Sequence, residues 1–296
     1  MTISENRGAG HLWIVGPGRL GLALGEAMLE RGAAGSLTFS GRAANPPAHP
    51  LLTDPRVAYQ PLEGSAPTGI DGVLVTVSDR EIQGVDATLA ALEISRNLPV
   101  LHTSGALGGD ALDRLRDRGH PTGSLHPLVS VPSAPDAYRR LLGAWFAVEG
   151  APAAIALAAG IVRALEGRPL EITPEGKPLY HAAAVLASNY VTTLLSVSER
   201  LLHEAGVDPA QSRPAMAALA TGAISSTLEL GPERALTGPI ARGDETTVRM
   251  HLSRLSAPDR ELYSVLARHT LELASSAGLP AESRAALARA LEEERT

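Results

Sequence analysis

The chain has 296 residues, of which 44% are hydrophobic and 20% charged, so it can bury the cores of two ordinary domains and is neither disordered nor fibrous. It contains no cysteine, which excludes disulfides, thiolate metal sites and a cysteine nucleophile. The formal net charge is −6 and no run of basic residues occurs, which argues against a nucleic-acid-binding surface and favours small-molecule chemistry.

No segment is apolar over the roughly 20 residues that a membrane-spanning helix needs, the longest apolar run being residues 151–162. Glu5 and Arg7 lie just before a strand-like segment, which leaves no room for the apolar core of a signal peptide. We therefore expect a cytoplasmic protein that binds neither membranes nor nucleic acids.

The first half of the chain alternates short β-rich runs with helical stretches, a pattern typical of βαβ units. Strands are predicted at residues 11–15, 36–40, 57–62, 72–78, 99–103, 122–126, 144–148 and 169–173. Helices are predicted between them, at residues 20–31, 82–92, 110–118 and 152–165. The pattern predicts an α/β Rossmann domain with a mostly parallel, extended sheet.

From residue 174 onward the apolar residues follow helical spacing and no strand-like run occurs. Helices are predicted at residues 174–205, 209–230, 244–255, 259–277 and 281–294, with a glycine- and proline-rich loop before the third. We expect two domains, a dinucleotide-binding domain over residues 1–173 and an all-α domain for substrate and dimer contacts over residues 174–296.

A glycine-rich loop of the form GxGxxG directly follows the first predicted strand and opens a helix. Gly16 permits a tight turn, Gly18 lets the backbone approach a pyrophosphate, and Gly21 lets the helix pack closely on the strand. The loop predicts a dinucleotide-binding site made by Gly16, Pro17, Gly18, Arg19, Leu20 and Gly21.

The end of the second strand indicates which dinucleotide is bound. An acidic residue there would take the ribose 2′-hydroxyl of NAD, but this sequence has Ser40 and Arg42 and no carboxylate. A hydroxyl and a guanidinium suit a 2′-phosphate, so NADP(H) is the expected cofactor.

Small and polar residues follow several other strands, where ligands of such sheets bind. Val77, Ser78, Thr103 and Ser104 are expected at the nicotinamide end of the cofactor, with Ser104 and His126 also contacting substrate. His102 and His126 lack a neighbouring carboxylate ligand, so we expect hydrogen-bonded histidines and no metal.

Lys177 is the only lysine among 26 basic residues. Arginine cannot release a proton near neutral pH whereas a partly buried lysine can, so a catalytic role is one physical reason for the exception, chance being the other. Lys177, His181 and Ser188 share one face of a helix, beside Asn189, while Leu179 and Leu186 lie on other faces and are expected in the core. Lys177 and His181 are therefore the predicted catalytic residues, and Ser188 and Asn189 predicted substrate contacts.

The loop before residue 245 offers a further site for a substrate carboxylate. Thr237 and Arg242 are candidate contacts, because a helix N-terminus with a nearby arginine can hold an anion. Asp244 is at least as well explained as the cap of that helix.

The glycine loop, residues 101–107 and 125–128, residues 177–190 and residues 236–244 together resemble a largely uncharacterised family of NADP-dependent oxidoreductases. That family lies within the superfamily of 6-phosphogluconate and 3-hydroxyisobutyrate dehydrogenases, ketopantoate reductases and pyrroline-5-carboxylate reductases. The resemblance implies a Rossmann domain, a helical substrate domain and a dimer formed through the helices. It also implies a catalytic lysine at Lys177, but relatives have an asparagine where His181 stands.

The sequence therefore predicts an NADP(H)-dependent oxidoreductase that reduces a small oxo acid, ketopantoate-like, with Lys177 donating to the carbonyl oxygen. Two alternatives remain open: an imine reductase of the pyrroline-5-carboxylate kind, and a protein that senses NADP(H) without chemistry. A deazaflavin in place of NADP is a further alternative for the same loop.

Overall fold

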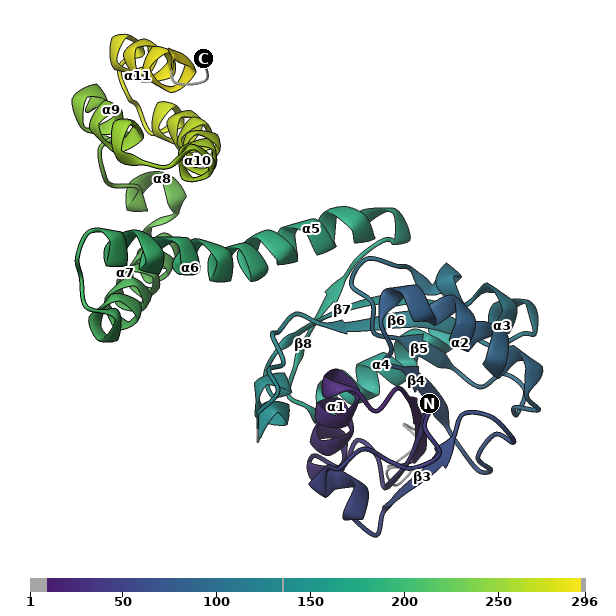
Figure 1. Cartoon of the computed structure of the whole chain (residues 1–296). Coiled ribbons are helices and arrows are strands. Elements are labelled where there is room, and N and C mark those ends of the chain that lie inside the picture. The colour runs from purple at the N-terminus through teal and green to yellow at the C-terminus, as the bar shows by residue number, and fades with distance from the viewer. Residues whose placement is uncertain (1–9, 135, 294–296) are drawn as a thin grey trace. The chain divides into compact units, whose positions relative to one another are not determined.

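The computed structural model describes residues 10–134 and 136–293. Two compact units make up the chain, one ending at Ser188 and the other beginning at Asn189 (Figure 1). The boundary predicted from the sequence, between residues 173 and 174, lies earlier in the chain than this one, because the helix that follows residue 174 belongs to the unit that contains the sheet. The expectation about a signal peptide rests on residues outside the described part of the chain.

The first unit is built on an eight-stranded sheet of order β3-β2-β1-β4-β5-β6-β7-β8. Neighbouring strands are parallel except β6 and β7, which run antiparallel. Val15 at the end of β1 is in register with Ser40 of β2 and Val75 of β4, so the carboxyl ends of these three strands lie at one edge. The strands are β1 (His11–Val15), β2 (Ser36–Gly41), β3 (Val57–Pro61), β4 (Gly72–Val75), β5 (Val100–His102), β6 (Thr122–Pro127), β7 (Trp145–Gly150) and β8 (Arg168–Glu171).

Alternation along β1 produces two hydrophobic cores, one on each face of the sheet. Leu12 and Ile14 belong to the core that also holds α1 and α4, whereas Trp13 and Val15 belong to the core that holds α2 and α3. The helices of this unit that precede β8 are α1 (Arg19–Glu30), α2 (Asp79–Ala91), α3 (Asp113–Asp117) and α4 (Pro152–Ala164). The predicted α/β Rossmann domain with an extended, mostly parallel sheet is confirmed.

The single helix predicted over residues 174–205 is wrong. A short 3₁₀ turn (Pro174–Gly176) leads into α5 (Lys177–Ala187), and a separate helix α6 (Asn189–Glu204) follows. Ser188 lies between them with φ −122° and ψ −69°, outside helical geometry. Serine and asparagine side chains compete for backbone hydrogen bonds, which explains why the helix is interrupted at this pair.

The expectation that Leu179 and Leu186 of α5 build the core is also wrong. Leu179 is 79% exposed and Leu186 is 61% exposed. The buried residue of this helix is instead Lys177, so α5 is attached to the sheet unit mainly through polar groups.

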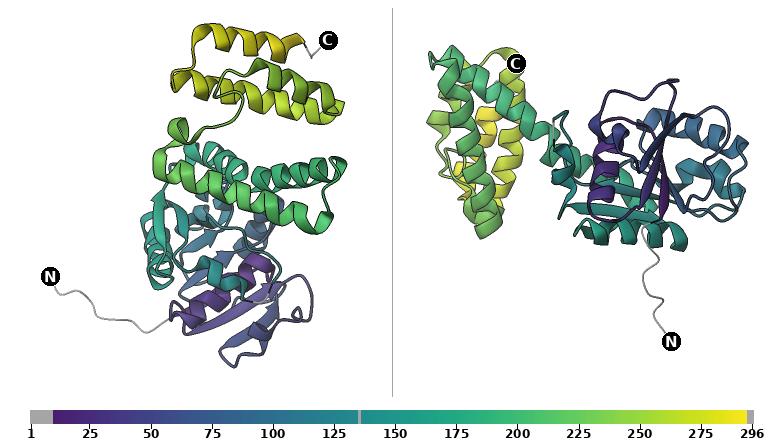
Figure 2. Two further views of the ribbon diagram at one scale, coloured as in Figure 1. Left: turned by 90° about the vertical axis from the view of Figure 1, so that its left-hand side faces the viewer. Right: turned by 90° about the horizontal axis from the view of Figure 1, so that it is seen from below.

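All regular elements described from Asn189 to Glu293 are helices, as predicted for the second half of the chain. The long helices α6 and α7 (Pro209–Leu230) pack side by side (Figure 2). A short helix α8 (Pro232–Ala235) leads to α9 (Glu245–Arg254), α10 (Ala257–Ser276) and α11 (Ala281–Glu293). These last three surround a core that includes Val248, Leu252, Leu271 and Leu287.

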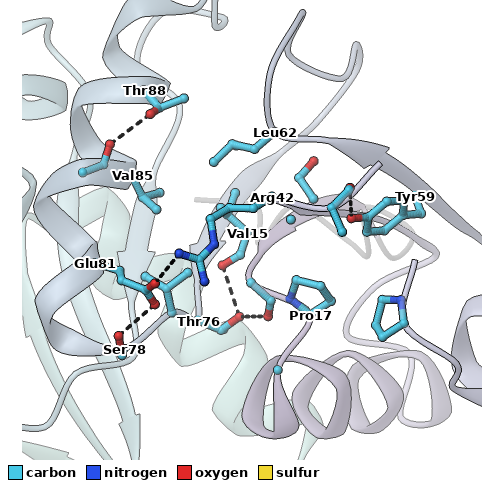
Figure 3. A pocket seen from close by; sticks show the side chains of 18 of the residues that line it. Val15, Pro17, Arg42, Tyr59, Leu62, Thr76, Ser78, Glu81, Val85 and Thr88 are labelled. Carbon is cyan, nitrogen blue, oxygen red and sulfur yellow. Dashed lines mark hydrogen bonds and ion pairs between the residues drawn. The ribbon is translucent and has the colours of Figure 1, made fainter. Parts of the chain in front are cut away.

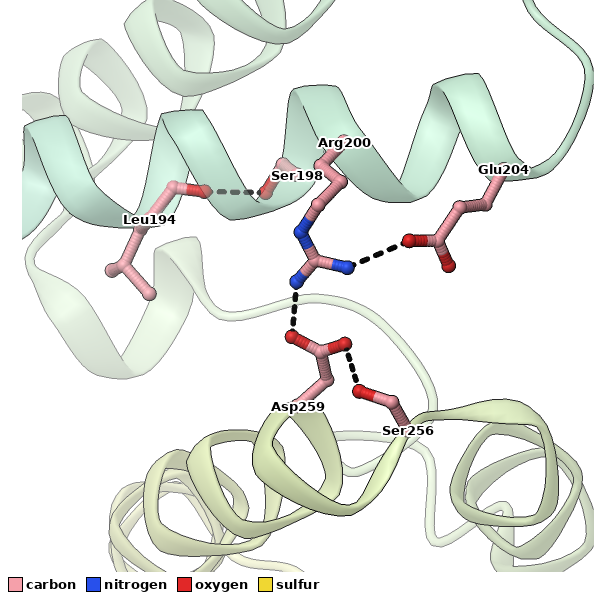
Figure 4. A network of polar contacts seen from close by, with 6 residues as sticks. All are labelled: Leu194, Ser198, Arg200, Glu204, Ser256 and Asp259. Atoms are coloured by element: carbon pink, nitrogen blue, oxygen red, sulfur yellow. Dashed lines mark hydrogen bonds and ion pairs between the residues drawn. The ribbon is translucent and has the colours of Figure 1, made fainter.

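A polar network fixes α6 to α10 within this second unit (Figure 4). The Arg200 guanidinium donates to Asp259 and, at 2.7 Å, to Glu204, while the Ser256 hydroxyl donates to the other oxygen of Asp259. The arginine and serine hydrogen bonds hold the pKa of Asp259 below its usual value.

Among the described helices, none combines the length and apolar character needed to cross a membrane. Within residues 10–134 and 136–293, His, Asp and Glu side chains form no cluster of three that could hold a metal ion.

Candidate functional site

The glycine loop has the local geometry that a bound pyrophosphate requires. Gly16 has φ +114°, and a Cβ there would lie 2.9 Å from the Thr76 carbonyl carbon. A Cβ on Gly21 would lie 2.2 Å from the Gly16 carbonyl oxygen, so only glycine allows this contact of helix and strand. Gly18 opens α1 without a side-chain cap and faces open space, which leaves the first-turn amides free to bind an anion.

A cavity of about 860 Å³ extends from this loop along the ends of β1, β2 and β4 to α2 (Figure 3). Its walls include Gly16, Pro17, Gly18, Ser40, Arg42, Val77 and Ser78, all predicted from the sequence to bind the cofactor. Val85 and Leu62 add apolar surface of the kind that an adenine ring contacts. The shape and lining of the cavity fit the adenosine half of a dinucleotide.

The end of β2 carries no carboxylate, as predicted, but a carboxylate from another element lies beside Arg42. Arg42 reaches from the end of β2 across the cavity to Glu81 on α2 (Figure 3), where Nη1 lies 3.0 Å from Oε1. The Ser78 hydroxyl donates to the other oxygen at 2.8 Å. The prediction rests on the strand end alone, whereas the fold brings this acidic residue from α2, which begins 39 positions after Ser40.

A second cavity, of about 380 Å³, lies at the carboxyl ends of β4, β5 and β6. It shares Thr76, Val77 and Ser78 with the larger cavity, so the two lie next to each other along the sheet edge. Its walls bring together several predicted site residues: Arg19, Leu20, Val77, Ser78, Thr103, Ser104, His126 and His181. This is the position in which a nicotinamide ring and a substrate would meet in a Rossmann domain.

His126 on β6 presents a neutral ring to this cavity. Its Nδ1 lies 2.7 Å from the Tyr180 hydroxyl of α5. Burial lowers the pKa of His126 to about 4, with the positive charge of Lys177 acting in the same direction. Burial also raises the pKa of Tyr180 to about 12, so the phenol keeps its proton at neutral pH.

His181 approaches the same point from α5. Its Nδ1 is buried and makes no hydrogen bond within the described part of the chain. A Cβ on Gly105 would lie 2.6 Å from this Nδ1 and 2.9 Å from His126 Nε2. The two ring nitrogens thus both lie beside Gly105, and an unpaired polar nitrogen such as His181 Nδ1 is costly unless a ligand or water satisfies it.

Lys177 lies behind the cavity wall rather than in it. Its side chain is 1% exposed, and Nζ donates to the Ser104 carbonyl oxygen at 3.0 Å and to the Ser124 hydroxyl at 2.8 Å. Burial lowers the pKa of Lys177 to about 8, although the nearby Glu149 carboxylate opposes that shift. The predicted polar row of Lys177, His181 and Ser188 is therefore not a single substrate-facing surface, because Lys177 points into the protein.

His102 fixes the loop that Lys177 contacts. Its Nδ1 accepts from the Ser104 amide at 3.1 Å, so Nε2 carries the proton and donates to the Gly108 carbonyl at 2.8 Å. Burial lowers the pKa of His102 to about 4, and the ring stays neutral. The Ser104 hydroxyl accepts from the amides of Ala106 and Leu107, which completes a rigid turn around Gly105.

Four predicted substrate contacts do not line either of these cavities. Ser188 is exposed at the helix interruption, while Asn189, Thr237 and Arg242 belong to the second unit and are exposed there. Asp244 caps α9, since its carboxylate accepts from the Thr247 amide at 3.0 Å and from the Thr247 hydroxyl at 2.7 Å.

Sequence reasoning missed Tyr180, Gly105, Ser124 and Glu81. Tyr180 lies three positions after Lys177, and residues with this spacing are neighbours on the surface of a helix. The spacing could therefore have identified Tyr180 from the sequence. Ser124, by contrast, meets Lys177 only because β6 lies beside β5, which no local pattern reveals.

Two domain families match the chain. A Rossmann-like domain matches residues 5–127, and a domain of unknown function, DUF2520, matches residues 144–270. A search of curated proteins found no match.

Several solved structures share this fold. TM1727 from Thermotoga maritima is 24% identical, with 90% of this chain and 98% of that one covered and a TM-score of 0.68. BF3122 from Bacteroides fragilis, named as a candidate NADP oxidoreductase, is 20% identical, with coverage of 89% and 98% and a TM-score of 0.68. Plasmodium falciparum pyrroline carboxylate reductase, solved with NADP bound, is 13% identical, with coverage of 94% and 98% and a TM-score of 0.56.

Proposed function

Because the chain joins a Rossmann-like domain to a DUF2520 domain and has the fold of the superfamily that its motifs resemble, we propose that it is an NADP(H)-dependent oxidoreductase. Its substrate is a small oxo acid, ketopantoate-like, whose carbonyl carbon accepts a hydride. A bound nicotinamide cofactor would supply that hydride, and the groups of this chain bind the reactants and provide the proton.

The observation that carries the proposal is the pairing of two adjoining cavities along the strand ends. The larger one has a glycine loop, an uncapped helix start and Arg42, which suit an adenosine, a pyrophosphate and a 2′-phosphate. The smaller one has two histidine nitrogens that both lie beside Gly105, at the strand ends where the nicotinamide end would arrive.

His126 and His181 are the groups best placed to meet the substrate heteroatom. If the Tyr180 hydroxyl donates to His126 Nδ1, then Nε2 of His126 carries a proton. His126 can pass that proton to the oxygen that becomes negatively charged while the Tyr180 proton moves to Nδ1, so that the histidine stays neutral. His181 Nδ1 can share that role. Arg19, exposed on the wall of the same cavity, can hold the carboxylate of the substrate.

Lys177 acts on this site through the loop that it contacts, without lining the cavity itself. Its ammonium group holds the Ser104 carbonyl and so positions the turn that forms one wall of the cavity. A buried positive charge near the cavity also stabilises negative charge that develops on the substrate, without touching it. This differs from the direct donor role expected from the sequence.

The burial of Lys177 also favours a second candidate function, reduction of a cyclic imine. An imine-reducing site has no obvious need for a lysine donor, so a Lys177 that lined the cavity would count against this function. With Lys177 outside the cavity wall, that objection no longer applies.

A substrate screen tests the proposal. Oxo acids and cyclic imines are incubated with enzyme and NADPH, with NADH in parallel, and the loss of reduced-nicotinamide absorbance is followed. Turnover of an oxo acid supports the first candidate and turnover of an imine the second. Tight NADPH binding without any turnover would instead support a sensor that performs no chemistry.

We also propose that the chain forms a homodimer through its helical unit. The apolar side chains of α7 are exposed over several faces, with Leu219 at 67%, Ile224 at 51% and Leu228 at 84%. Such a helix is normally covered by a partner, and an identical chain is the simplest one.

A further inference from the structure

Glu81 is an acidic residue inside a cavity that otherwise suits an anion. The cavity walls carry Arg42 and Arg80, which favour a phosphate group, and Glu81 opposes them. This inference rests on the proposed dinucleotide site and concerns which dinucleotide that site prefers.

The Glu81 carboxylate is held at both oxygens. Arg42 Nη1 lies 3.0 Å from one and the Ser78 hydroxyl donates to the other at 2.8 Å. The Glu81 side chain is 32% exposed, so it is fixed against the wall, whereas the Arg42 side chain is 88% exposed. Arg42 is therefore the member of the pair that can turn toward a ligand, and Glu81 stays where it is.

A bound 2′-phosphate would have to compete with the Glu81 carboxylate for the Arg42 guanidinium. Its negative charge would then lie close to the fixed Glu81 carboxylate, and like charges at short range repel each other. An exposed ion pair changes an equilibrium constant by no more than about fivefold. The phosphate therefore still binds Arg42, but less tightly than it would without Glu81. A ligand with a free 2′-hydroxyl leaves the ion pair intact.

We propose that Glu81 is a specificity-determining residue that weakens the preference for 2′-phosphorylated dinucleotides by competing for Arg42. The site is thus able to use both forms of the cofactor, with NADP(H) preferred by a moderate rather than a large factor.

The test compares two nucleotides that differ only in the 2′-phosphate, 5′-AMP and adenosine 2′,5′-bisphosphate. Each is titrated calorimetrically into the full-length wild-type chain, Glu81→Gln and Arg42→Ala. Glu81→Gln should raise the affinity ratio in favour of the bisphosphate by roughly threefold to fivefold, and the gain should shrink at high salt. Arg42→Ala should remove most of the preference.

Glu166→Gln is the matched control, because Glu166 also pairs with an exposed arginine, Arg31, but lies in neither cavity. The double variant Glu81→Gln/Arg42→Ala should match Arg42→Ala if Glu81 acts through Arg42. An unchanged or lowered ratio in Glu81→Gln overturns the inference while leaving the cofactor site in place. Failure of both nucleotides to bind the wild-type chain overturns the dinucleotide site, and this inference with it.

Discussion

The hydroxyl of Tyr180 lies 2.7 Å from Nδ1 of His126, and the ring of His126 stands edge-on to that of His181 with centroids 6.0 Å apart. Two adjacent residues of α5 thus contact one histidine of β6 from different sides. The contact fixes the orientation of the His126 ring and, through the phenol proton, the tautomer that faces the cavity.

Replacing Tyr180 by phenylalanine removes the hydroxyl and keeps the ring. We expect kcat to fall roughly tenfold, with little change in NADPH affinity, because the proton on His126 Nε2 is no longer favoured. Steady-state kinetics over a range of pH should show a changed profile as well as a lower maximum. Tyr190→Phe, at an exposed tyrosine outside the cavity, is the control and should behave as wild type.

Replacing Lys177 by methionine keeps much of the volume and removes the charge. We expect kcat to fall about 100-fold while the melting temperature changes little, since burying an ammonium group is itself unfavourable. In the wild-type enzyme, activity should also decline as pH rises through about 8, where the ammonium loses its proton. Full turnover by Lys177→Met would rule out a role for this charge in the reaction.

His102 should make the fold sensitive to mild acid. Its pKa is about 4 in the folded chain and 6.5 when unfolded, so the unfolded state binds more protons between these values. The free energy of unfolding should therefore fall as pH drops from 6.5 to 4, with His102 accounting for about 3 kcal/mol of the loss. Urea unfolding across that range measures it, and His102→Gln, although less stable at neutral pH, should show a flatter dependence.

Gly105→Ala should lower the activity without unfolding the chain. The added methyl group would lie 2.6 Å from His181 Nδ1 and 2.9 Å from His126 Nε2, so both rings must move. We expect kcat to fall at least tenfold with unchanged NADPH binding and a native circular dichroism spectrum. Gly160→Ala in α4 is the matched control, because its methyl group meets nothing within 4 Å and alanine favours a helix.

The proposed dimer is tested on α7. Ile224 and Leu228 are four positions apart, so they share one face of the helix. Replacing both by glutamate should convert a dimer to a monomer in light scattering at micromolar concentration. Leu170→Glu, at an exposed leucine of β8, should leave the oligomeric state unchanged. A wild-type monomer would contradict the proposal directly.

Local patterns were enough to predict the strands, most helices and the cofactor loop. The segment over residues 72–78, for example, is apolar and bounded by turn residues, and β4 spans Gly72–Val75 within it. The starts of helices that carry a proline in the first turn, such as α7, were also predicted well. Proline fits the first turn of a helix but not its interior.

Contacts between elements distant in sequence were not predictable in this way. The single lysine of the sequence correctly indicated an unusual position. Its ammonium group is hydrogen-bonded inside the protein, however, and this becomes visible only when the neighbouring strands β5 and β6 are in place. Glu81 was missed for the same reason: its relation to Arg42 arises where a helix end and a strand end meet. In both cases the charge was visible in the sequence and its partner was not.

The interruption at Ser188 separates the residues of the proposed redox site from the helical unit. Every residue proposed here to hold the dinucleotide or to deliver a proton lies before it, and the helical unit begins after it. Recombination or rapid divergence downstream of this point would therefore leave all of these residues together in one inherited segment. Chimeras joined at residues 188 and 189 would test whether the helical unit has any effect on which substrates are accepted.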